Sequence, residues 1–166
     1  MKINAIDEYG LRILIRLAKE GRQEGLSISQ LSELEGLSGA YVAKLTRMLR
    51  AGGLINSNRG NKGGYVLAMN PKEITVCMAL QALGGALFES GFCASHAGNN
   101  KFCTHSVDCS VRSLWRMVQT SMDQLLNQIT IYDLLGSEKQ SREKLQFIFD
   151  QTVSKKEGSI IEFTEH

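Results

Sequence analysis

Residues 36–72 read GLSGAYVAKLTRMLRAGGLINSNRGNKGGYVLAMNPK, and this stretch decides the fold of the 166-residue chain. It carries six Lys and Arg side chains and no Asp or Glu, whereas the whole chain has 19 Lys plus Arg against 17 Asp plus Glu. A segment of net charge +6 therefore stands on a remainder of −4. Such a local positive face attracts a polyanion and makes its binding salt-dependent. Charge alone also fits an ordinary solvated surface, so the apolar pattern has to decide.

The first part of this stretch predicts a helix with one buried face. Ser38 is a good N-cap and the pair Gly52-Gly53 is a good stop, so the helix has about 13 residues and a length of ~20 Å. Its apolar residues recur at intervals of three and four positions: Tyr41, Val42, Leu45, Met48 and Leu49.

A shorter helix is predicted just upstream, capped by Ser27 or Ser29 and ended by Gly36. Two helices joined by so tight a turn form a helix-turn-helix, in which the second, here called the recognition helix, enters the major groove of DNA. Gly39 and Ala40 keep the leading end of this helix slim, so its backbone can approach base edges closely.

Two short β-type runs follow the recognition helix. Residues 54–55 and 65–67 flank a glycine-rich turn that carries Arg59 and Lys62. This is the outline of a winged helix, whose hairpin contacts phosphate or the minor groove while the helix occupies the major groove. The predicted fold class is mainly α with a small β-hairpin wing.

A known family matches this pattern. Residues 41–68, YVAKLTRMLRAGGLINSNRGNKGGYVLA, and 71–85, PKEITVCMALQALGG, resemble winged-helix transcription regulators of the IscR and NsrR type. The resemblance covers about residues 1–136, and its specific motif is the wing, Arg-Gly-x-x-Gly-Gly-Tyr from Arg59 to Tyr65. It implies a homodimeric bacterial repressor or activator that binds double-stranded DNA at a pseudo-palindromic operator. Members often have an acidic residue where this chain has Ala43, so its operator is expected to differ.

The candidate DNA-contacting residues lie on the recognition helix and on the hairpin. Their side chains are cationic or polar, or small enough to admit the DNA backbone. They are Ser38, Gly39, Tyr41, Lys44, Arg47, Arg59, Gly60, Asn61 and Lys62.

Composition bounds the rest of the chain. With 166 residues, 43% of them hydrophobic, one modest core and an extension are expected. The start lacks a signal peptide's apolar core, and no stretch approaches the ~20 apolar residues of a membrane span. A cytoplasmic protein without a membrane partner is therefore predicted. In that reducing compartment the four cysteines are expected to be thiols or metal ligands.

Two further helices are predicted around the helix-turn-helix. The first, at about residues 7–19, has apolar residues at intervals of three and four and packs behind the helix-turn-helix. The second spans residues 75–83 and carries Cys77, which is expected to be a buried free thiol.

A long loop is predicted between residues 84 and 108. Three cysteines lie in it or directly after it, with the spacing C-x9-C-x5-C: Cys93, Cys103 and Cys109. His96 and His105 lie between them. Soft thiolates gathered in one cytosolic loop suit an iron-sulfur cluster or zinc. Related sensors usually show x5 and x5 spacing. The longer first gap costs only ~0.5 kcal/mol of loop-closure free energy, so it does not exclude a cluster.

The resemblance also implies where a fourth ligand comes from. In IscR-like chains a histidine follows three residues after the last cysteine, where this chain has Arg112. In NsrR-like chains an acidic residue at the start of the first helix reaches across from the partner subunit, and Glu8 stands there. Glu8 is the predicted ligand beside the three cysteines, with His105, His96 or an exogenous group as alternatives. The cofactor is predicted to be a [2Fe-2S] or [4Fe-4S] cluster that senses redox state, nitric oxide or iron.

Two other classes of function stay open at this point. Cys93, Cys103, His105 and Cys109 could hold a structural zinc, or the cysteines could be oxidised directly in a cluster-free regulator. A thiol redox enzyme or cluster carrier is disfavoured, because the sequence has no C-x-x-C motif and no phosphate-cradling glycine loop that opens a helix. The chain is therefore not expected to be an enzyme.

The C-terminal part predicts the longest helix, at about residues 111–128, and a short one at 130–136. The longer helix pairs with a second copy of the chain or packs on its own winged domain, through an apolar seam at intervals of three and four: Val111, Leu114, Trp115, Val118, Met122, Leu125, Leu126 and Ile129.

The expected organisation has four parts. A winged helix-turn-helix domain at residues 1–84 is followed by the cysteine-bearing loop at 85–110, the dimerisation helices at 111–136 and an extension at 137–166. The extension is expected to be helical in part and a poorly ordered tail in the rest.

Overall fold

The computed structural model describes residues 4–20, 24–58, 63–85, 92–95, 103, 105 and 107–161, with the side chains of the last helix described as far as Thr152. The helices and strands in chain order are α1 (Ala5–Glu20), α2 (Ile28–Glu35), α3 (Gly39–Ala51), β1 (Ile55–Ser57), β2 (Tyr65–Leu67), α4 (Val76–Ala82), α5 (Phe92–Ser95), α6 (Ser110–Leu126), the 3-10 helix η1 (Ile131–Leu134) and α7 (Glu138–Ile161). The mainly helical fold with a small hairpin is as predicted.

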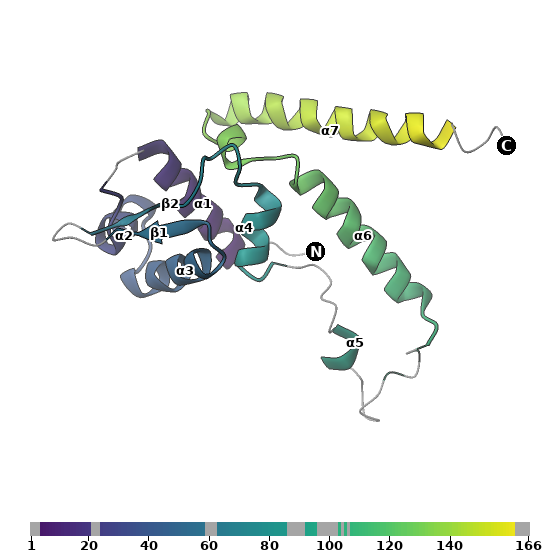
Figure 1. Cartoon of the computed structure of the whole chain (residues 1–166), viewed down its shortest axis with the longest axis horizontal. Coiled ribbons are helices and arrows are strands. Elements are labelled where there is room, and N and C mark those ends of the chain that lie inside the picture. Colours follow the sequence, from purple (N-terminus) through teal and green to yellow (C-terminus); the bar gives the residue numbers. More distant parts are fainter. Residues whose placement is uncertain are drawn as a thin grey trace.

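A single core joins α1 to the helices and strands that follow it as far as α4. Ile13 and Leu14 of α1 and Leu45 and Leu49 of α3 are completely buried in it. Since a fully buried Leu or Ile side chain contributes about 1.5–3 kcal/mol, this core stabilises the region from α1 to α4, here called the body. α1 lies behind the helix-turn-helix, as the spacing of its apolar residues predicts (Figure 1).

The helix-turn-helix forms because both of its helices are capped locally. Ser27 begins α2 with a reciprocal capping box: Gln30 N–H donates to its Oγ, and its own N–H donates to the Gln30 side chain. Gly36 ends α2 at φ +64°, a left-handed conformation that glycine adopts without strain. Ser38 then caps α3, accepting the Tyr41 N–H at 3.3 Å. The predicted limits of the recognition helix are confirmed, with 13 residues in α3.

The two strands form an antiparallel hairpin in which Ile55 pairs with Leu67 and Ser57 with Tyr65. β2 continues the pairing on its other side, where Leu26 and Tyr65 exchange backbone hydrogen bonds of 3.0 and 2.8 Å. The segment before α2 therefore becomes a third partner of the wing, which fixes the hairpin to the body.

The C-terminal end of α3 lies against α4. A Cβ on Gly52 would stand 2.4 Å from the Cβ of Ala82, so only glycine permits this approach. Thr75 caps α4, accepting the Met78 N–H at 3.1 Å, so the helix predicted at residues 75–83 is present as Val76–Ala82.

Beyond α4 the chain leaves the body and returns to it. α6 runs beside the body, and α7 lies across the top and extends past it (Figure 1). Between them, Val76 N–H donates to the Ile129 carbonyl at 2.8 Å and Ile131 N–H to the Ile74 carbonyl at 2.9 Å. The start of η1, with Ile131 fully buried, is thereby attached to the body.

One expectation about this region is wrong: α6, with 17 residues, is not the longest helix, because α7 has 24. Residues 138–144 of α7 include no apolar side chain, so the first two turns of this helix have no helical period of apolar residues in the sequence. The cysteine-bearing segment also includes the short helix α5, which was expected as loop. Among the described residues, no helix is both long enough and apolar enough to cross a membrane.

Candidate nucleic-acid interface and candidate metal ligands

The recognition helix presents a cationic face to solvent. Lys44, Arg47 and Arg50 of α3 are exposed, while Val42 and Leu45 on the opposite side are completely buried. The buried side fixes the helix, and the exposed side carries three positive charges within two turns. This arrangement can neutralise phosphates and hydrogen-bond base edges.

The leading end of α3 contains the remaining candidates on this helix. Ser38 is exposed, and Gly39 is half-buried. Tyr41 is half-buried too, because its ring meets the ring of Tyr9 edge to face, with 5.9 Å between the ring centroids. The guanidinium of Arg12 lies 5.4 Å from the centroid of Tyr9. Tyr41 therefore joins the recognition helix to the first turns of α1.

The wing candidates Arg59, Gly60, Asn61 and Lys62 lie outside the described residues. The base of their turn is described. There, Asn58 N–H donates to the Gly64 carbonyl at 2.8 Å, which continues the hairpin pairing beyond β1 and β2.

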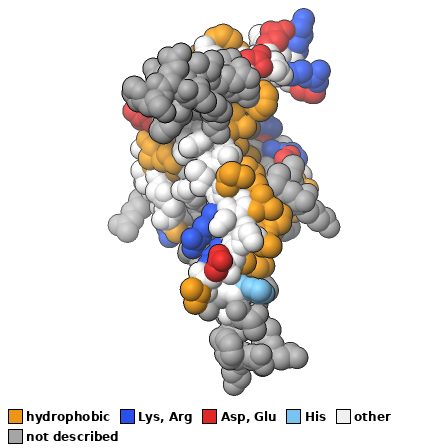
Figure 2. Space-filling view, turned by 90° about the vertical axis from the view of Figure 1, so that its right-hand side faces the viewer, with side chains coloured by type: hydrophobic (Ala, Val, Ile, Leu, Met, Phe, Trp, Pro, Cys, Tyr) orange, Lys and Arg blue, Asp and Glu red, His pale blue; other side chains and the backbone are white. Residues whose placement is uncertain are grey.

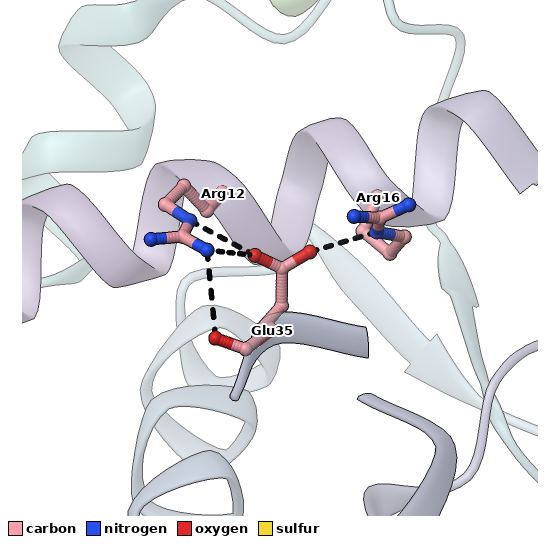
Figure 3. A network of polar contacts seen from close by, with 3 residues as sticks. All are labelled: Arg12, Arg16 and Glu35. Atoms are coloured by element: carbon pink, nitrogen blue, oxygen red, sulfur yellow. Dashed lines mark hydrogen bonds and ion pairs between the residues drawn. The ribbon is translucent and has the colours of Figure 1, made fainter. Parts of the chain in front are cut away.

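A buried carboxylate ties α1 to the helix-turn-helix (Figure 3). The Glu35 side chain, 4% exposed, accepts Arg12 Nε at 2.9 Å through one oxygen and Arg16 Nε at 2.7 Å through the other. A second Arg12 nitrogen also donates to the Glu35 carbonyl at 3.4 Å. The sequence analysis missed this site. The available signal was an arginine pair four residues apart on α1, together with an acid at the end of α2.

The three candidate ligand cysteines are half-buried free thiols on different parts of the chain. Cys93 lies on α5, and Cys103 lies between α5 and α6. Cys109 is the N-cap of α6, with its Sγ accepting the Arg112 N–H at 3.4 Å. The sulfur of Cys109 therefore lies at the N-terminus of α6.

The structure does not gather these ligands into a site. Within the part of the chain that is described, no three His, Cys, Asp or Glu side chains lie close enough together to hold a metal ion. His96 lies outside the described residues, and His105 is exposed. The donor set fits a thiophilic metal in its chemistry, since three free thiols are present.

The first turn of α1 contains both acids considered in the sequence analysis. Glu8 is exposed, and Asp7 is half-buried. Asp7 Oδ1 is buried without a hydrogen-bond partner among the described residues, and it stands 2.8 Å from where a Cβ on Gly85 would lie. Of the two acids, Glu8 is therefore the more exposed to solvent.

Cys77 is set apart from the other cysteines. It is 2% exposed on α4, so the expectation of a buried free thiol is confirmed. Its Sγ lies 3.7 Å from Asp123 Oδ1 of α6, and Gln81 donates to it at 3.4 Å. Burial raises the pKa of the Cys77 thiol, and the neighbouring Asp123 carboxylate raises it further.

The seam of α6 is exposed at its Val111 end and becomes more covered toward Ile129, which is buried. No residue within α6 is buried, and Val111 and Leu114 are 60% and 49% exposed. Figure 2 shows hydrophobic side chains gathered down one side of this helix. The single chain therefore leaves the Val111 end of the seam uncovered, and pairing with a second copy stays a prediction.

The capped helix-turn-helix, the hairpin behind it and the cationic face of α3 define a winged-helix, DNA-binding regulator. A model of the Rrf2 family, described as iron-dependent transcriptional regulators, matches residues 3–137. The chain belongs to the Rrf2 family.

Relatives of known name support the same assignment. The protein rrf2 of Nitratidesulfovibrio vulgaris is 32% identical over 135 residues, which cover 81% of this chain and 87% of that protein. Two solved structures share the fold. The IscR of T. potens has a TM-score of 0.61 at 31% identity and covers 81% of this chain and 86% of its own. CymR of B. subtilis, described as its global cysteine regulator, has a TM-score of 0.60 at 30% identity. The match covers 81% of this chain and 96% of the CymR chain.

The family is described as one of transcriptional regulators, and homologues named IscR and CymR are HTH-type transcriptional regulators, as the resemblance implies. Their descriptions differ, since the family is described as iron-dependent and CymR as a global cysteine regulator. Membership of the family therefore leaves the signal of this chain to be argued from its own residues.

Proposed function

We propose that the chain is a homodimeric regulator that binds a pseudo-palindromic operator in double-stranded DNA through α3 and the wing. The observation that carries this proposal is the exposed Lys44, Arg47 and Arg50 face on a helix whose other side is completely buried. Two such helices related by a two-fold axis, one DNA turn or ~34 Å apart, would meet two half-sites. The open seam of α6 supports pairing with a second copy.

Control by an iron-sulfur cluster is the second part of the proposal. Cys93, Cys103 and Cys109 of one subunit and Glu8 of the partner subunit would hold it. When bound, such a cluster supplies reversible redox chemistry and reactivity toward nitric oxide. The chain's own contribution is position, since Cys109 is the N-cap of α6 and Glu8 lies in the first turn of α1. Ligands on these two helices would couple the dimer seam to the helix that packs behind α3.

The expected size of this coupling is moderate. Allosteric coupling typically amounts to about 1–3 kcal/mol, or about 5- to 150-fold in operator affinity. The basic face of α3 would keep its general attraction to DNA in both states, because that attraction comes from its own charges.

Direct chemistry at the thiols is the second candidate function. It is favoured by the state of the three cysteines, which are free and only half-buried, and by the lack of a gathered metal site in the described part of the chain. CymR, described as a global cysteine regulator, shares the fold. In this case oxidation of a thiol would change operator affinity without a metal. A structural zinc is the remaining alternative.

DNA binding is tested by the salt dependence of affinity for an operator fragment. Arg47→Ala is expected to weaken binding and to lower the slope of log K against log salt by about 1, because one phosphate contact is lost. Lys139→Ala, at an exposed position of α7, is the control and should leave the slope unchanged. Equal slopes for the parent and Arg47→Ala would contradict the assigned face.

The nature of the sensor is tested by purification without oxygen, followed by iron, sulfide and zinc analysis and an absorption spectrum. Visible absorption that is lost in Glu8→Ala and in the triple variant of Cys93, Cys103 and Cys109 would support the cluster. Asp7→Ala is the matched control for Glu8. A colourless protein with one zinc per chain would favour structural zinc, and reversible thiol titration of metal-free protein would favour direct oxidation.

A further inference from the structure

The last helix, α7, lies beyond the family match, which ends at residue 137. It is attached to the rest of the chain at its start by η1 and further along by Thr152, whose hydroxyl donates to the Gln128 side chain at 3.1 Å. Between these points, the C-terminal end of α6 and the facing side of α7 line a groove with a volume of about 490 Å³. Its apolar lining comes from Leu125 and Ile129 on one side and from Leu145 and Phe149 on the other.

This groove is open to solvent in the single chain. Phe149 is 49% exposed, although it lines the groove beside apolar neighbours. Glu138 and Arg142 also line it, and they form a salt bridge of 2.9 Å with each other. Because these two charges are paired with each other, neither of them opposes an apolar occupant of the groove as an isolated charge would.

The opposite end of α6 carries bulky apolar side chains that project outward. Trp115 is 43% exposed, and Val111 and Leu114 are more exposed still. A helix turns 100° per residue, so these three share one face with Leu125 and with the positions that continue the seam. The apolar face of α6 therefore projects into solvent at its Trp115 end and borders the groove at its Leu125 end.

The seam is spaced symmetrically about Thr120. Positions 111 and 129, 114 and 126, 115 and 125, and 118 and 122 are each equidistant from residue 120, and all eight are apolar. When two such helices pair antiparallel about a two-fold axis at this residue, each apolar position meets an apolar position. Trp115 then lies opposite Leu125, which lines the groove. A self-complementary pattern of this kind identifies a second copy of the chain as the occupant.

The size of a stable interface also requires more than α6. A helix of 17 residues is ~25 Å long and ~10 Å wide, so its face offers a footprint on the order of 250 Å². A standard interface buries about 800 Å² per partner. The groove against α7 supplies additional apolar surface at each end of the pair.

We propose that the groove between α6 and α7 receives Trp115 of a second copy, so that α7 completes the dimer interface of this chain. The inference rests on the proposed homodimer and adds the residues and the helix that close it. Two such contacts form in each dimer, one at either end of the paired helices.

The test compares substitutions that face the groove with matched substitutions that do not. Phe149→Glu places a charge in the groove, whereas Phe147→Glu changes a 62% exposed phenylalanine that does not line it. Trp115→Ala removes the projecting side chain, whereas Met117→Ala changes a 63% exposed residue on another side of α6. Mass is measured by sedimentation on the full chain at several concentrations. The groove variants are expected to raise the dimer dissociation constant at least 30-fold and the two controls less than threefold.

Complementation separates docking from simple misfolding. A mixed dimer of Trp115→Ala with Phe149→Glu loses one docking contact and keeps the other intact, since one copy still offers its tryptophan and the other its groove. Mixing the two monomeric variants is therefore expected to restore dimers. Trp115 is the only tryptophan in the chain, so the mixture emits from the Phe149→Glu copy alone. Its emission should shift to the blue as the other variant is added, because the ring leaves water.

A parent dimer that Phe149→Glu leaves intact, or two monomeric variants that fail to complement, overturns the role of α7 and leaves the proposed regulator standing. A parent chain that is monomeric and shows no affinity for operator DNA overturns the proposed function itself. Weaker dimers in both groove variants with complementation in the mixture support the inference.

Discussion

The body and the C-terminal helices of this chain differ in how far a single copy can bury its apolar residues. In the body, Leu45 and Leu49 are completely covered by neighbours from the same chain. In α6 no residue is buried, although its apolar residues are spaced as regularly as those of α3. The comparison teaches that helical periodicity predicts an apolar face without saying which chain covers it. The body buries its own apolar residues, whereas α6 leaves much of its apolar face uncovered.

The largest effect expected from this difference is a contrast between two leucine truncations. Leu45→Ala creates a cavity in the body and should lower the free energy of unfolding by about 2–5 kcal/mol at every protein concentration. Leu114→Ala, at a 49% exposed position, should destabilise the protein only where the dimer forms. Urea denaturation at two concentrations at least 50-fold apart measures both. A concentration-independent loss of several kcal/mol in Leu114→Ala would contradict the comparison.

A smaller effect is expected at the carboxylate that joins α1 to the helix-turn-helix. Glu35→Gln keeps the shape of the side chain and removes its charge, so two charge-assisted contacts are weakened. The expected loss is about 1–2 kcal/mol, at the lower end because Arg12 and Arg16 remain 43% and 32% exposed and can be hydrated. Glu33→Gln, an exposed position on the same helix, is the control. Thermal or urea unfolding measures the loss. Equal free energies of unfolding for the parent and Glu35→Gln would show that the ion pairs contribute nothing to stability.

The cap of the recognition helix gives an effect of about 1 kcal/mol. Ser38→Ala removes the acceptor of the Tyr41 N–H and should destabilise the body by that amount. Ser38→Asp keeps a good cap and should restore stability. Because it adds a negative charge at the candidate DNA face, it should still weaken operator binding. Stability and DNA affinity measured on the same two variants separate the structural role from the contact.

The smallest effect concerns the alkaline limit of stability. The pKa of Cys77 is raised in the folded protein, first by burial and then by Asp123, so above the ordinary thiol pKa of 9.0 the unfolded chain loses this proton first. Stability supported by the protonated thiol is therefore present at lower pH and is lost as the pH rises through that range. Cys77→Ala should flatten the decline of melting temperature above pH 9 relative to the parent under reducing conditions. If the melting temperature of Cys77→Ala declined with pH as steeply as that of the parent, the decline would come from titrating groups other than Cys77.

Much of the body could be predicted from sequence because its signals are local. Ser27, Gly36 and Ser38 mark the helix ends within a few residues of the hydrogen bonds that they make, and the apolar spacing of α3 identifies its buried side. The hairpin followed from a glycine-rich turn between two β-type runs. The capping of α4 by Thr75 was predictable for the same reason.

Contacts between residues far apart in the chain were not predictable in this way. Arg12 and Arg16 meet Glu35 across 23 and 19 residues, and no local pattern specifies that pairing. The Tyr9–Tyr41 contact is another such case. The ligand set of the three cysteines and Glu8 remains a prediction, because it would join two chains. Arg59, Gly60, Asn61 and Lys62 also remain predicted contacts, as they lie outside the described residues.

The two arginines on Glu35 have a consequence for how the recognition helix can move. A single contact between α1 and α2 would act as a pivot and leave α2 free to rotate about it. Two contacts, made by residues four positions apart on α1, remove that rotation. α1 and the helix-turn-helix should therefore shift as one rigid unit. A force applied at the first turn of α1 would reorient the helix-turn-helix as a whole instead of bending it.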